Sequence, residues 1–600
     1  MKKCEYETAL ERVEYPYRRW IKENEKSEYD CNKAESDRKK VLEDHYLFTR
    51  KGASIEERLY AYVLNYPDMD FIYADEDLLD EEGNRTEPYF KSDWAPETIL
   101  SYYYPGSITV VKKKIADLVE KEFPYKKGSN DFLRECALKS ATHLHINEVL
   151  LHRTDRLSTE YEKVPDNDNS EIRISCIILS KDHPEMLEKC VTGLNKAAAD
   201  DNIVLRTIVV DNGSSSENAK YYEAASKLLN FEYCPHPMPF EYSTLCNFGA
   251  FLVKDNELLL FLNDDIEVPA GTLFLRKMAE MALRKEVGAV GCKLLYPDGI
   301  KIQHNGISLL KSGPSHRLCT YTDDREYCGG VNTHSRNVIA VTGAALMCSY
   351  KKFRAVGGFD EGLKIAYTDV DLCFAFIREG LRNVCMSDFY LIHHESISRD
   401  DDIAERSAYE RLKKERKFFE NKYADILAKG DIYESSHWSR VSLNYEPLLE
   451  SFEEKLGVTD RLDILDKRKY RLKQAGKRFH YSLDTISYRL NDAFGNENFY
   501  EIQGWAFMGG CPGYEYDLKI VIENGGRRYI LDSARRYRSD IEMVFAEEKN
   551  CRLSGFIAKI RADIIPEGDN KIYLALVRRS FFSKDILKGE IADSGKVISL

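Results

Sequence analysis

Two adjacent aspartates, Asp264 and Asp265, follow an apolar run at 258–262 and its closing Asn263. In an open α/β sheet, ligands bind at the carboxyl ends of the strands, which is where this pair is expected. Because a buried carboxylate without a partner is costly, two in a row indicate a cation or a ligand hydroxyl beside them. A hard divalent ion such as Mn2+ or Mg2+ takes oxygen ligands and commonly bridges to substrate phosphates. A turn in which an aspartate caps the next helix is the alternative.

Three further segments carry residues suited to binding or catalysis. Asp211 and Asn212 close another apolar run and precede a Gly/Ser turn, whose backbone amides could face a phosphate. Asp369 opens an apolar helical stretch, where a carboxylate could take a proton from an attacking hydroxyl. His393 and His394 follow a predicted strand and could bind a metal ion. Each segment also has a structural interpretation, since Asp and Ser cap helices and histidine is often a core residue.

Strands and helices must alternate to position these groups, and the sequence from 172 to 402 has that pattern. Continuous apolar runs such as 258–262 are separated by stretches with helical spacing, as at Leu187, Val191 and Leu194. Strands that are apolar throughout and linked by helices indicate a parallel sheet covered on both faces. The region is therefore predicted to be an α/β domain with a Rossmann-like, mostly parallel sheet.

Ordered blocks of this region resemble the family-2 glycosyltransferases, whose catalytic domain has the GT-A fold. The matching text is ISCIILSKDHPEMLEKCV, VVDNGSSS, FEYSTLCNFGA, LLLFLNDDIEV, IQHNGISL, VTGAALM, VGGFDE, YTDVDLC and HHESISR. Within the family, the blocks are most similar to bacterial rhamnosyltransferase-like enzymes of O-antigen, capsule or cell-wall polysaccharide synthesis. The resemblance covers about 172–400. It implies that the catalytic domain carries a nucleotide-sugar site and a metal site.

The resemblance also implies a role for individual residues. Asp265 would ligate Mn2+ or Mg2+ on the donor diphosphate, with His393 as a further ligand and His394 as the alternative. Asp369 would be the catalytic base of a single displacement, which inverts the anomeric centre. Cys246 stands where relatives commonly carry a second amide, which puts donor-sugar contacts in doubt. The nucleotide-sugar donor would be bound by Ser180, Asp211, Asn212, Asn247 and Asp264.

Changes in composition divide the rest of the chain. Residues 1–60 are charged and are predicted to form a helical lead-in. The polar stretch 165–171 is predicted to be a linker, and 403–477 a helical and linker region. Short apolar runs recur between turns in 478–600, which predicts a β-sandwich accessory domain. An aromatic platform for sugars around Trp505 is one interpretation of this domain, and core packing is the other.

Residues 61–164 form a smaller α+β unit with a second resemblance to the same family. YADEDLLDEEGNRTEPYFKSDWAPETILS looks like the later half of a GT-A domain, with Asp75 and Asp77 at its metal motif. No nucleotide-binding strand and turn precede it. We therefore expect a truncated, inactive copy that supports the second domain or holds acceptor glycan.

Composition limits the partners and the compartment. The 600 residues carry a net charge of −13, which argues against a general nucleic-acid binder. Fifteen scattered cysteines without a CxxC pair indicate reduced thiols rather than a disulfide framework. The N-terminus lacks the apolar segment of a secretory signal, and no apolar run is long enough to span a membrane. We expect a cytoplasmic protein, with peripheral contact at the inner face of the plasma membrane through the basic stretch 467–478 as one option.

The sequence thus predicts a metal-dependent, inverting glycosyltransferase. It would move a sugar from a nucleotide-sugar donor to a hydroxyl of a growing bacterial surface polysaccharide or lipid-linked glycan. The alternative is a non-catalytic glycan-binding or scaffold protein built from degenerate glycosyltransferase domains. Retention of Asp264, Asp265 and Asp369 favours the enzyme.

Overall fold

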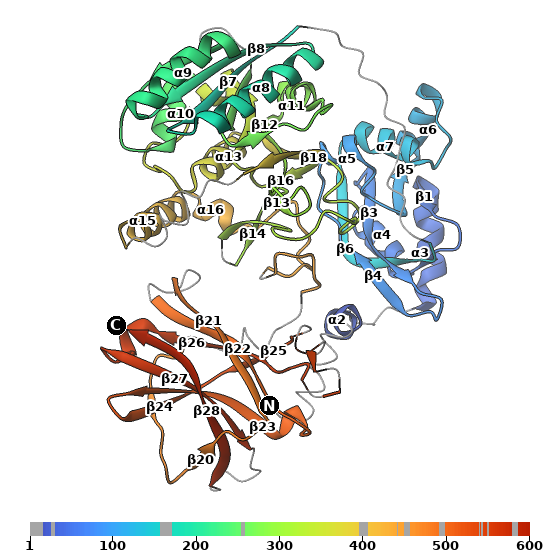
Figure 1. Cartoon of the computed structure of the whole chain (residues 1–600). Helices are drawn as coiled ribbons and strands as arrows, with labels where there is room; N and C mark the ends of the chain where they lie inside the picture. Colours follow the sequence, from blue (N-terminus) through green and yellow to red (C-terminus); the bar gives the residue numbers. More distant parts are fainter. Residues whose placement is uncertain are drawn as a thin grey trace. The chain divides into compact units, whose positions relative to one another are not determined.

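The computed structural model describes most of the chain as two compact units. One unit comprises 27–446, and the other combines 1–26 with 447–600 (Figure 1). The predicted linker, except for its last residue, and the predicted boundary between 402 and 403 lie outside the described residues. Those residues are 16–25, 31–155, 171–253, 258–311, 313–394, 406–440, 442–448, 457–490, 498–538, 541, 544–545, 547–548, 551–578 and 586–599.

A ten-stranded sheet forms the centre of the larger unit. Its order is β11-β18-β12-β17-β10-β7-β8-β9, with β13 paired to β12 and β16 to β18. The strands are β7 (Ile172–Ser180), β8 (Ile203–Asp211), β9 (Phe231–Pro235), β10 (Leu258–Asn263), β11 (Ile266–Glu267), β12 (Val287–Leu295), β13 (Ile302–His304), β16 (Arg336–Val338), β17 (Ala345–Ser349) and β18 (Arg382–His393).

The sheet is mixed, so the prediction of a mostly parallel sheet is wrong for one half of it. β10, β7, β8 and β9 pair in parallel, as do β12 and β18. β17 runs antiparallel to both β10 and β12, and β11, β13 and β16 are also antiparallel to their neighbours. A parallel pair needs a crossover connection, usually a helix, whereas the antiparallel strands are joined by loops that show no helical period.

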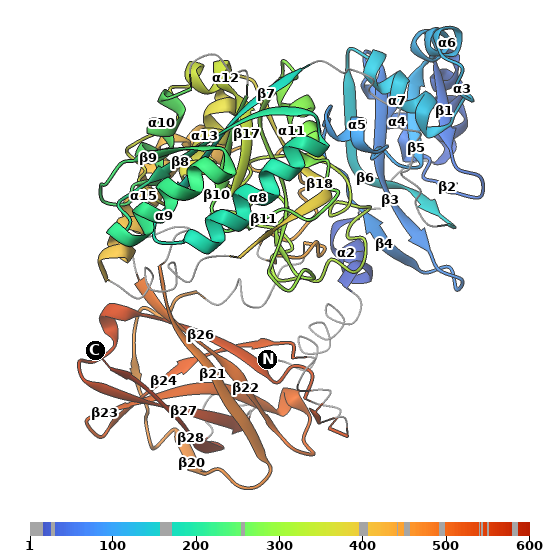
Figure 2. The ribbon, with the colours of Figure 1, turned by 45° about the horizontal axis from the view of Figure 1, so that its top comes forward.

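Helices cover both faces of this sheet (Figure 2). The core on one face includes residues of α8 (Pro184–Asp200), α9 (Ser216–Leu229) and α11 (Phe274–Leu283). The core on the other includes residues of α10 (Tyr242–Phe251), α12 (Tyr350–Ala355), α13 (Thr368–Arg378), α15 (Arg406–Lys422) and α16 (Ala424–Leu427). None of the described helices is long and apolar enough to cross a membrane.

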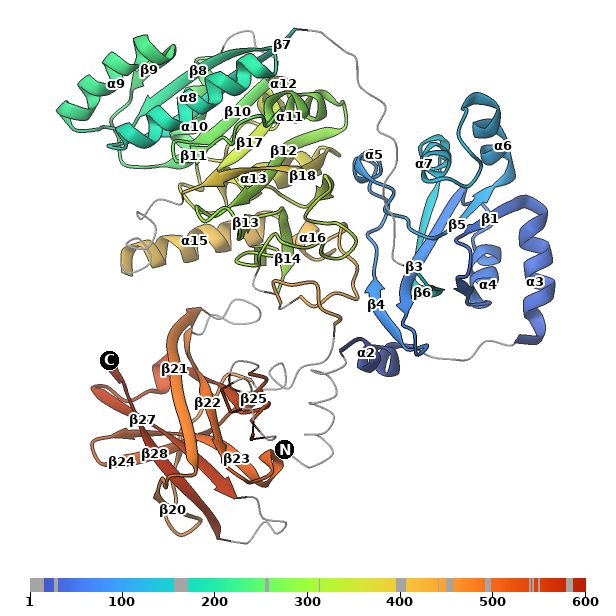
Figure 3. The same cartoon turned by 45° about the vertical axis from the view of Figure 1, so that its right-hand side comes forward.

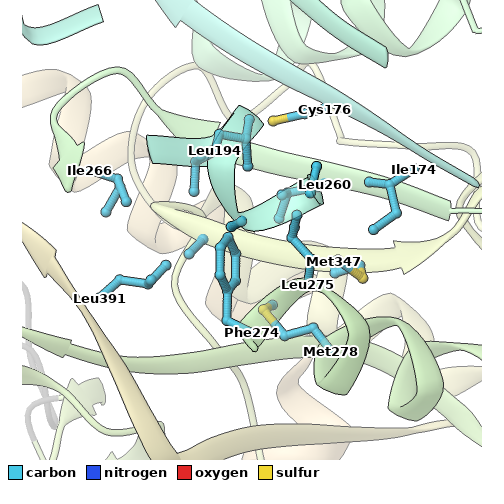
Figure 4. Close-up of a cluster of buried hydrophobic side chains, with 14 of the residues drawn as sticks. Ile174, Cys176, Leu194, Leu260, Ile266, Phe274, Leu275, Met278, Met347 and Leu391 are labelled. Carbon is cyan, nitrogen blue, oxygen red and sulfur yellow. The ribbon is translucent and has the colours of Figure 1, made fainter. Parts of the chain in front are cut away.

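The side-chain alternation of β7 explains why its sequence is apolar throughout. Ile174, Cys176 and Ile178 belong to the core beneath α8 and α11, whereas Ile177 belongs to the opposite core. Figure 4 shows the first core, in which Phe274 of α11 and Leu260 of β10 lie together. Because both faces are buried, the strand ends are held rigidly where the polar residues of the site begin.

The N-terminal part of the larger unit is built on a six-stranded sheet, with the path β1-β5-β3-β6-β2 and β4 paired to β3. Helices α3 and α4 contribute to the core on one face, and α6 and α7 to the core on the other (Figure 3). A short helix, α5, follows β4. The elements are α3 (Cys31–Asp44), β1 (His45–Thr49), β2 (Ser54–Ile55), α4 (Arg58–Asn65), β3 (Phe71–Leu79), β4 (Arg85–Tyr89), α5 (Thr98–Ser101), β5 (Ile108–Lys112), α6 (Lys113–Glu122), α7 (Asn130–Lys139) and β6 (His143–Arg153).

The predicted helical lead-in at 1–60 therefore needs correction, because β1 and β2 are strands of this sheet. Tyr46 and Phe48 pack on one core and Leu47 on the other, which is the two-residue period of a strand. The run is only five residues long and follows directly on α3, so the helical pattern before it obscured the alternation.

Buried polar contacts join this N-terminal part to the central sheet. Arg382 at the start of β18 donates to both carboxylate oxygens of Glu97, each at 2.7 Å. The Asn337 amide nitrogen donates to Glu97 Oε2 at 2.7 Å, and its oxygen accepts from the backbone of Glu97 and Thr98. Only 4% of Glu97 is exposed, so this charge-assisted arrangement is shielded from solvent.

The C-terminal unit consists of two β-sheets with a shared core. The six-stranded sheet has the order β19-β24-β23-β27-β28-β20, and the four-stranded sheet β21-β22-β26-β25. Ile502 and Phe556 of the smaller sheet share a core with Ile520 and Leu574 of the larger. The strands are β19 (Asp463–Ile464), β20 (Tyr470–Gln474), β21 (Phe479–Leu490), β22 (Asn498–Met508), β23 (Tyr516–Asn524), β24 (Arg527–Asp532), β25 (Ala534–Arg536), β26 (Gly555–Arg561), β27 (Asp569–Arg578) and β28 (Leu587–Ser599).

The sheets begin earlier than the sequence predicts. β19 and β20 lie within 403–477, for which the sequence predicts helices and a linker. Both strands are largely exposed and rich in charge, and the hydrophobic alternation that marks a strand is weak in them. One short helix of this unit, α2 (Pro16–Asn24), comes from the N-terminal end of the chain.

Candidate active site

Neighbouring strand ends bring Ser180 and Asp264 together. Ser180 ends β7, and Asp264 directly follows β10, which pairs with β7 in parallel. The Ser180 hydroxyl donates to Asp264 Oδ2 at 2.7 Å, and it lies 3.0 Å from the Tyr222 hydroxyl. His183 Nδ1 lies 3.4 Å from the same carboxylate, and this contact raises the pKa of His183. The carboxylate is thus held by neutral and titratable groups at the edge where a ligand is expected.

Asp211 is occupied by its own loop. Its Oδ1 accepts hydrogen bonds from the backbone of Gly213 and Ser214 and from the Ser214 hydroxyl, at 2.7–3.0 Å. Its Oδ2 accepts from the Tyr233 hydroxyl at 2.6 Å. This pattern is that of an Asx turn, so the carboxylate fixes the shape of the loop after β8. A nucleotide contact by Asp211 itself stays a prediction.

Asn212, the next residue, has a different environment. Only 3% of Asn212 is exposed, yet neither its amide nitrogen nor its amide oxygen has a hydrogen-bond partner among the described residues. A buried amide left in this way costs about 1–3 kcal/mol, so it calls for an explanation. A ligand that supplies a donor and an acceptor at the end of β8 would provide one.

Asp265 and His393 form a carboxylate–imidazole pair. β11 pairs with the end of β18, and this pairing places His393 opposite Ile266. His393 Nε2 lies 3.1 Å from Asp265 Oδ1 and 3.2 Å from the amide nitrogen of Asn263. The pair is buried, since 2% of the Asp265 side chain and 13% of the His393 side chain are exposed.

Gln303, which the sequence analysis gave no role, orients His393. Its Oε1 lies 2.6 Å from His393 Nδ1, and a carbonyl oxygen only accepts, so Nδ1 carries the hydrogen. In neutral His393 the lone pair is then on Nε2, facing Asp265. Metal-binding histidines usually donate their other ring N–H to such a partner.

The structure brings His393, and not His394, to Asp265 through its side chain. His394 Nε2 lies 2.9 Å from Glu267 Oε2, which also lies 2.5 Å from Lys189 Nζ. Lys189, and then His394, lower the pKa of Glu267. The alternative ligand is therefore engaged in a surface ion-pair cluster.

Asp265 and His393 fit a cation that is shared with a substrate. No group of three or more His, Cys, Asp or Glu side chains has the arrangement of a metal site in the part of the chain that the structure describes. Mg2+ and similar ions are commonly held by one or two protein ligands, with water and substrate phosphates completing the shell. One carboxylate and one imidazole 3.1 Å apart suit that arrangement better than a site made of protein ligands alone.

Asp369 shares a cavity with His393. The cavity has a volume of about 450 Å3, and Tyr242, Tyr367 and His316 also line it. Asp369 lies in the first turn of α13, where its Oδ2 accepts from the Gly343 backbone N–H at 2.8 Å. The helix N-terminus and this N–H both stabilise the charged carboxylate. The candidate base Asp369 and the candidate metal ligand His393 thus line the same cavity.

Asn247 does not line the cavity of Asp369 and His393, and its contact with the donor stays a prediction. Its amide nitrogen donates to the Phe359 carbonyl and to Glu361 Oε1, and its oxygen accepts from the Phe359 N–H, at 2.9–3.0 Å. It lines a separate cavity of about 530 Å3. The amide fixes the 357–361 loop against α10, a structural use that a motif match cannot distinguish from ligand binding.

The acidic motif of the N-terminal part is paired with cationic side chains. Asp75, Glu76 and Asp77 lie within β3 (Phe71–Leu79) and are all fully buried. The contacts are His145 Nε2–Asp75 Oδ1 at 2.9 Å, Lys91 Nζ–Glu76 Oε2 at 3.0 Å, Arg153 Nε–Glu76 Oε1 at 3.0 Å, Arg85 Nε–Asp77 Oδ2 at 2.6 Å and His152 Nδ1–Asp77 Oδ1 at 2.6 Å. Protein cations thus surround the carboxylates that the sequence analysis assigned to a metal motif.

Two curated bacterial proteins are similar to this chain. The O-antigen biosynthesis protein RfbC of Myxococcus xanthus is 29% identical over 395 residues, which is 58% of this chain and 30% of that protein. The uncharacterised protein y4gI of Sinorhizobium fredii is 29% identical over 395 residues, which is 57% of this chain and 42% of that protein. The chain thus spans less than half the length of each of these relatives. No family model matches it. Its similarity is to the family-2 glycosyltransferases.

Solved glycosyltransferase structures overlap only loosely with this chain. The mannosyltransferase PcManGT of Pyrobaculum calidifontis, solved with GDP-Man and Mn2+, has a TM-score of 0.30 at 13% identity, over 40% of this chain and 61% of its own. S. aureus TarS has a TM-score of 0.30 at 11% identity, over 70% of this chain and 78% of its own. Superpositions this loose carry no conclusion about the fold or the site.

Proposed function

We propose that the chain is an inverting glycosyltransferase that uses a nucleotide-sugar donor and a divalent cation. One observation carries the proposal: His393, which is paired with Asp265, and Asp369 line one cavity at the carboxyl edge of a buried sheet. The similarity to an O-antigen biosynthesis protein supports a growing surface polysaccharide or lipid-linked glycan as the acceptor. Action at the cytoplasmic face of the membrane remains part of the proposal.

The donor would bind along the ends of β7, β8 and β10. Asn212 offers a buried amide to the nucleotide, and Asp264, held by Ser180, accepts from a ribose or sugar hydroxyl. Asp265 and His393 would hold Mn2+ or Mg2+, which when bound stabilises the negative charge of the departing diphosphate. Gln303 keeps the His393 lone pair directed toward that position.

Asp369 would accept the proton of the acceptor hydroxyl as that oxygen attacks the sugar carbon. The Gly343 N–H fixes one of its oxygens, and the Val370 N–H contacts the other at 2.8 Å. The carboxylate is therefore immobilised in one orientation. One base acting on the face opposite the leaving group gives inversion of the anomeric centre.

Calorimetry with UDP, dTDP, GDP and CDP, each with and without Mn2+, tests the proposal without knowledge of the acceptor. We expect one nucleotide to bind only with Mn2+, and Asp265→Ala to abolish that binding. Asp200→Ala, which removes an exposed carboxylate at the end of α8, is the matched control and should bind normally. If the intact chain binds no nucleotide under any condition, the transferase is refuted and a glycan-binding scaffold is the better account.

A further inference from the structure

A stripe of basic side chains follows β20 at the edge of the larger C-terminal sheet. The run from Lys467 to Arg478 contains seven lysines and arginines and no acidic residue, in a chain whose net charge is −13. All seven residues are exposed. Within the described residues β20 pairs with β28 alone, so the other side of the strand is an open edge. This basic stripe (467–478) concentrates positive charge on one edge of a chain that is acidic as a whole.

Most of these charges are not neutralised by the protein. Lys473 Nζ lies 3.1 Å from Glu590 Oε1, and Arg478 Nε donates to the Gly509 carbonyl at 2.9 Å. The other five have no ion-pair partner among the residues that the structure describes; they are Lys467, Arg468, Lys469, Arg471 and Lys477. Five cationic groups are therefore available to an external anion.

The register of β20 on β28 adds a pair of like charges. Arg471 lies opposite Lys588, which is also exposed, whereas Lys473 lies opposite its ion-pair partner Glu590. Like charges directly opposite each other destabilise a strand pair. An anionic group bound between Arg471 and Lys588 would offset this repulsion.

Apolar side chains accompany the basic ones. Ile586 is 43% exposed and directly precedes Leu587, whose N–H donates to the Lys469 carbonyl at 2.8 Å. Half-buried Tyr470 and Leu472 alternate with basic residues along β20. A soluble polyanion needs only the charges, whereas a lipid bilayer offers phosphates to the cations and an acyl boundary to the apolar groups. The composition of this edge therefore favours a bilayer.

We propose that the basic stripe, together with Lys588 and Ile586, docks the C-terminal unit onto a bilayer that contains acidic phospholipids. Arg471 and Lys588 would share a lipid phosphate, and Ile586 would enter the acyl boundary. The inference rests on the proposed function in one respect, since it supplies the surface at which a lipid-linked acceptor is held. The docking itself requires neither a nucleotide nor a metal ion.

Sedimentation of the full-length chain with lipid vesicles tests the electrostatic part. It should bind vesicles of phosphatidylglycerol and phosphatidylcholine but not phosphatidylcholine alone, and salt should weaken the binding because it screens exposed charges. Replacing Lys467, Arg468 and Lys469 together by Gln should lower the affinity about a hundred-fold, since each basic residue near an anionic surface contributes about five-fold. The matched control makes the same change in charge at exposed positions of the larger unit and should bind like wild type; it is Lys121→Gln, Lys126→Gln and Lys285→Gln. No binding to the mixed vesicles, or an equal loss in both triple variants, overturns the proposal.

Ile586→Ser tests the apolar part and distinguishes a bilayer from an anionic polymer. It should weaken vesicle binding about five-fold, the effect of losing one partly inserted isoleucine, and leave binding of dextran sulfate unchanged. A chain that binds dextran sulfate but not the mixed vesicles overturns the proposal in favour of an anionic polymer.

Nucleotide calorimetry on the same proteins separates this inference from the proposed function. Vesicle binding by a wild-type chain that binds no nucleotide refutes the transferase and supports the docking surface. Nucleotide binding by a chain that does not bind the mixed vesicles refutes only the docking surface.

Discussion

Replacing Gln303 should weaken metal binding although Gln303 is not itself a ligand. Its Oε1 accepts the hydrogen of His393 Nδ1 at 2.6 Å, and this contact holds the opposite nitrogen toward Asp265. Gln303→Leu keeps a side chain of similar length but removes the acceptor. His393 is then free to rotate or to move its hydrogen to Nε2, where it would block a cation.

The expected loss follows from what such outer partners contribute. Removing the group that orients a metal-binding histidine typically lowers metal affinity about 10–100-fold, which corresponds to about 1.4–2.7 kcal/mol. Gln303→Glu should bind at least as well as wild type, because a carboxylate accepts the same hydrogen and makes the imidazole a better ligand. If the orientation of His393 is the cause, Gln303→Leu should lower the metal affinity and Gln303→Glu should not.

Electron paramagnetic resonance of free Mn2+, titrated with the chain and its nucleotide, measures this affinity without any turnover. Gln474→Leu makes the same replacement at an exposed position of β20 in the other unit and should leave the affinity unchanged. Thermal unfolding of each variant checks that the fold is intact. If Gln303→Leu binds Mn2+ as tightly as wild type while His393→Ala does not bind it, the proposed role of Gln303 is wrong.

Two further predictions concern the N-terminal part of the larger unit. Lys91→Met should destabilise the chain by about 1.5–3 kcal/mol, because Glu76 loses one charge-assisted hydrogen bond while Arg153 still contacts it. Thermal unfolding measures this loss, and a shift no larger than that of the exposed variant Lys126→Met would contradict it. Arg382→Ala should also lower the unfolding temperature, because Glu97 loses both charge-assisted hydrogen bonds, and Arg382→Lys should recover only part of it, since lysine lacks the two-pronged geometry. An unfolding temperature of Arg382→Lys equal to that of wild type would show that charge, and not the two-pronged geometry, joins the parts.

The sequence alone locates Asp264 and Asp265 because the pattern that identifies them lies in the residues directly before them. Asp264 and Asp265 directly follow a strand whose continuous apolar run marks it as buried on both faces. Gln303 carries no such signal, because it reaches His393 from 90 residues away through the pairing of β12 with β13 and β18. Asn247 shows the converse: its motif is present, but its hydrogen bonds go to the 357–361 loop. Local patterns identify strand ends, whereas partners across a sheet depend on register.

Two sets of buried carboxylates, one within β3 and one after β10, differ in the side chains that contact them. At β3, the fixed cations Lys91, Arg85 and Arg153 contact Glu76 and Asp77. These covalently attached cations already compensate the negative charge of Glu76 and Asp77. A divalent ion would have to displace them, or it would add positive charge to a cluster that is already neutralised.

The contacts at the end of β10 have another character. They include a serine hydroxyl and two imidazoles. Buried carboxylates with such partners favour a divalent cation, which can in turn bind a diphosphate. The electrostatics therefore support the proposal that Asp264 and Asp265 serve cation-dependent chemistry, and they favour a structural role for Asp75, Glu76 and Asp77.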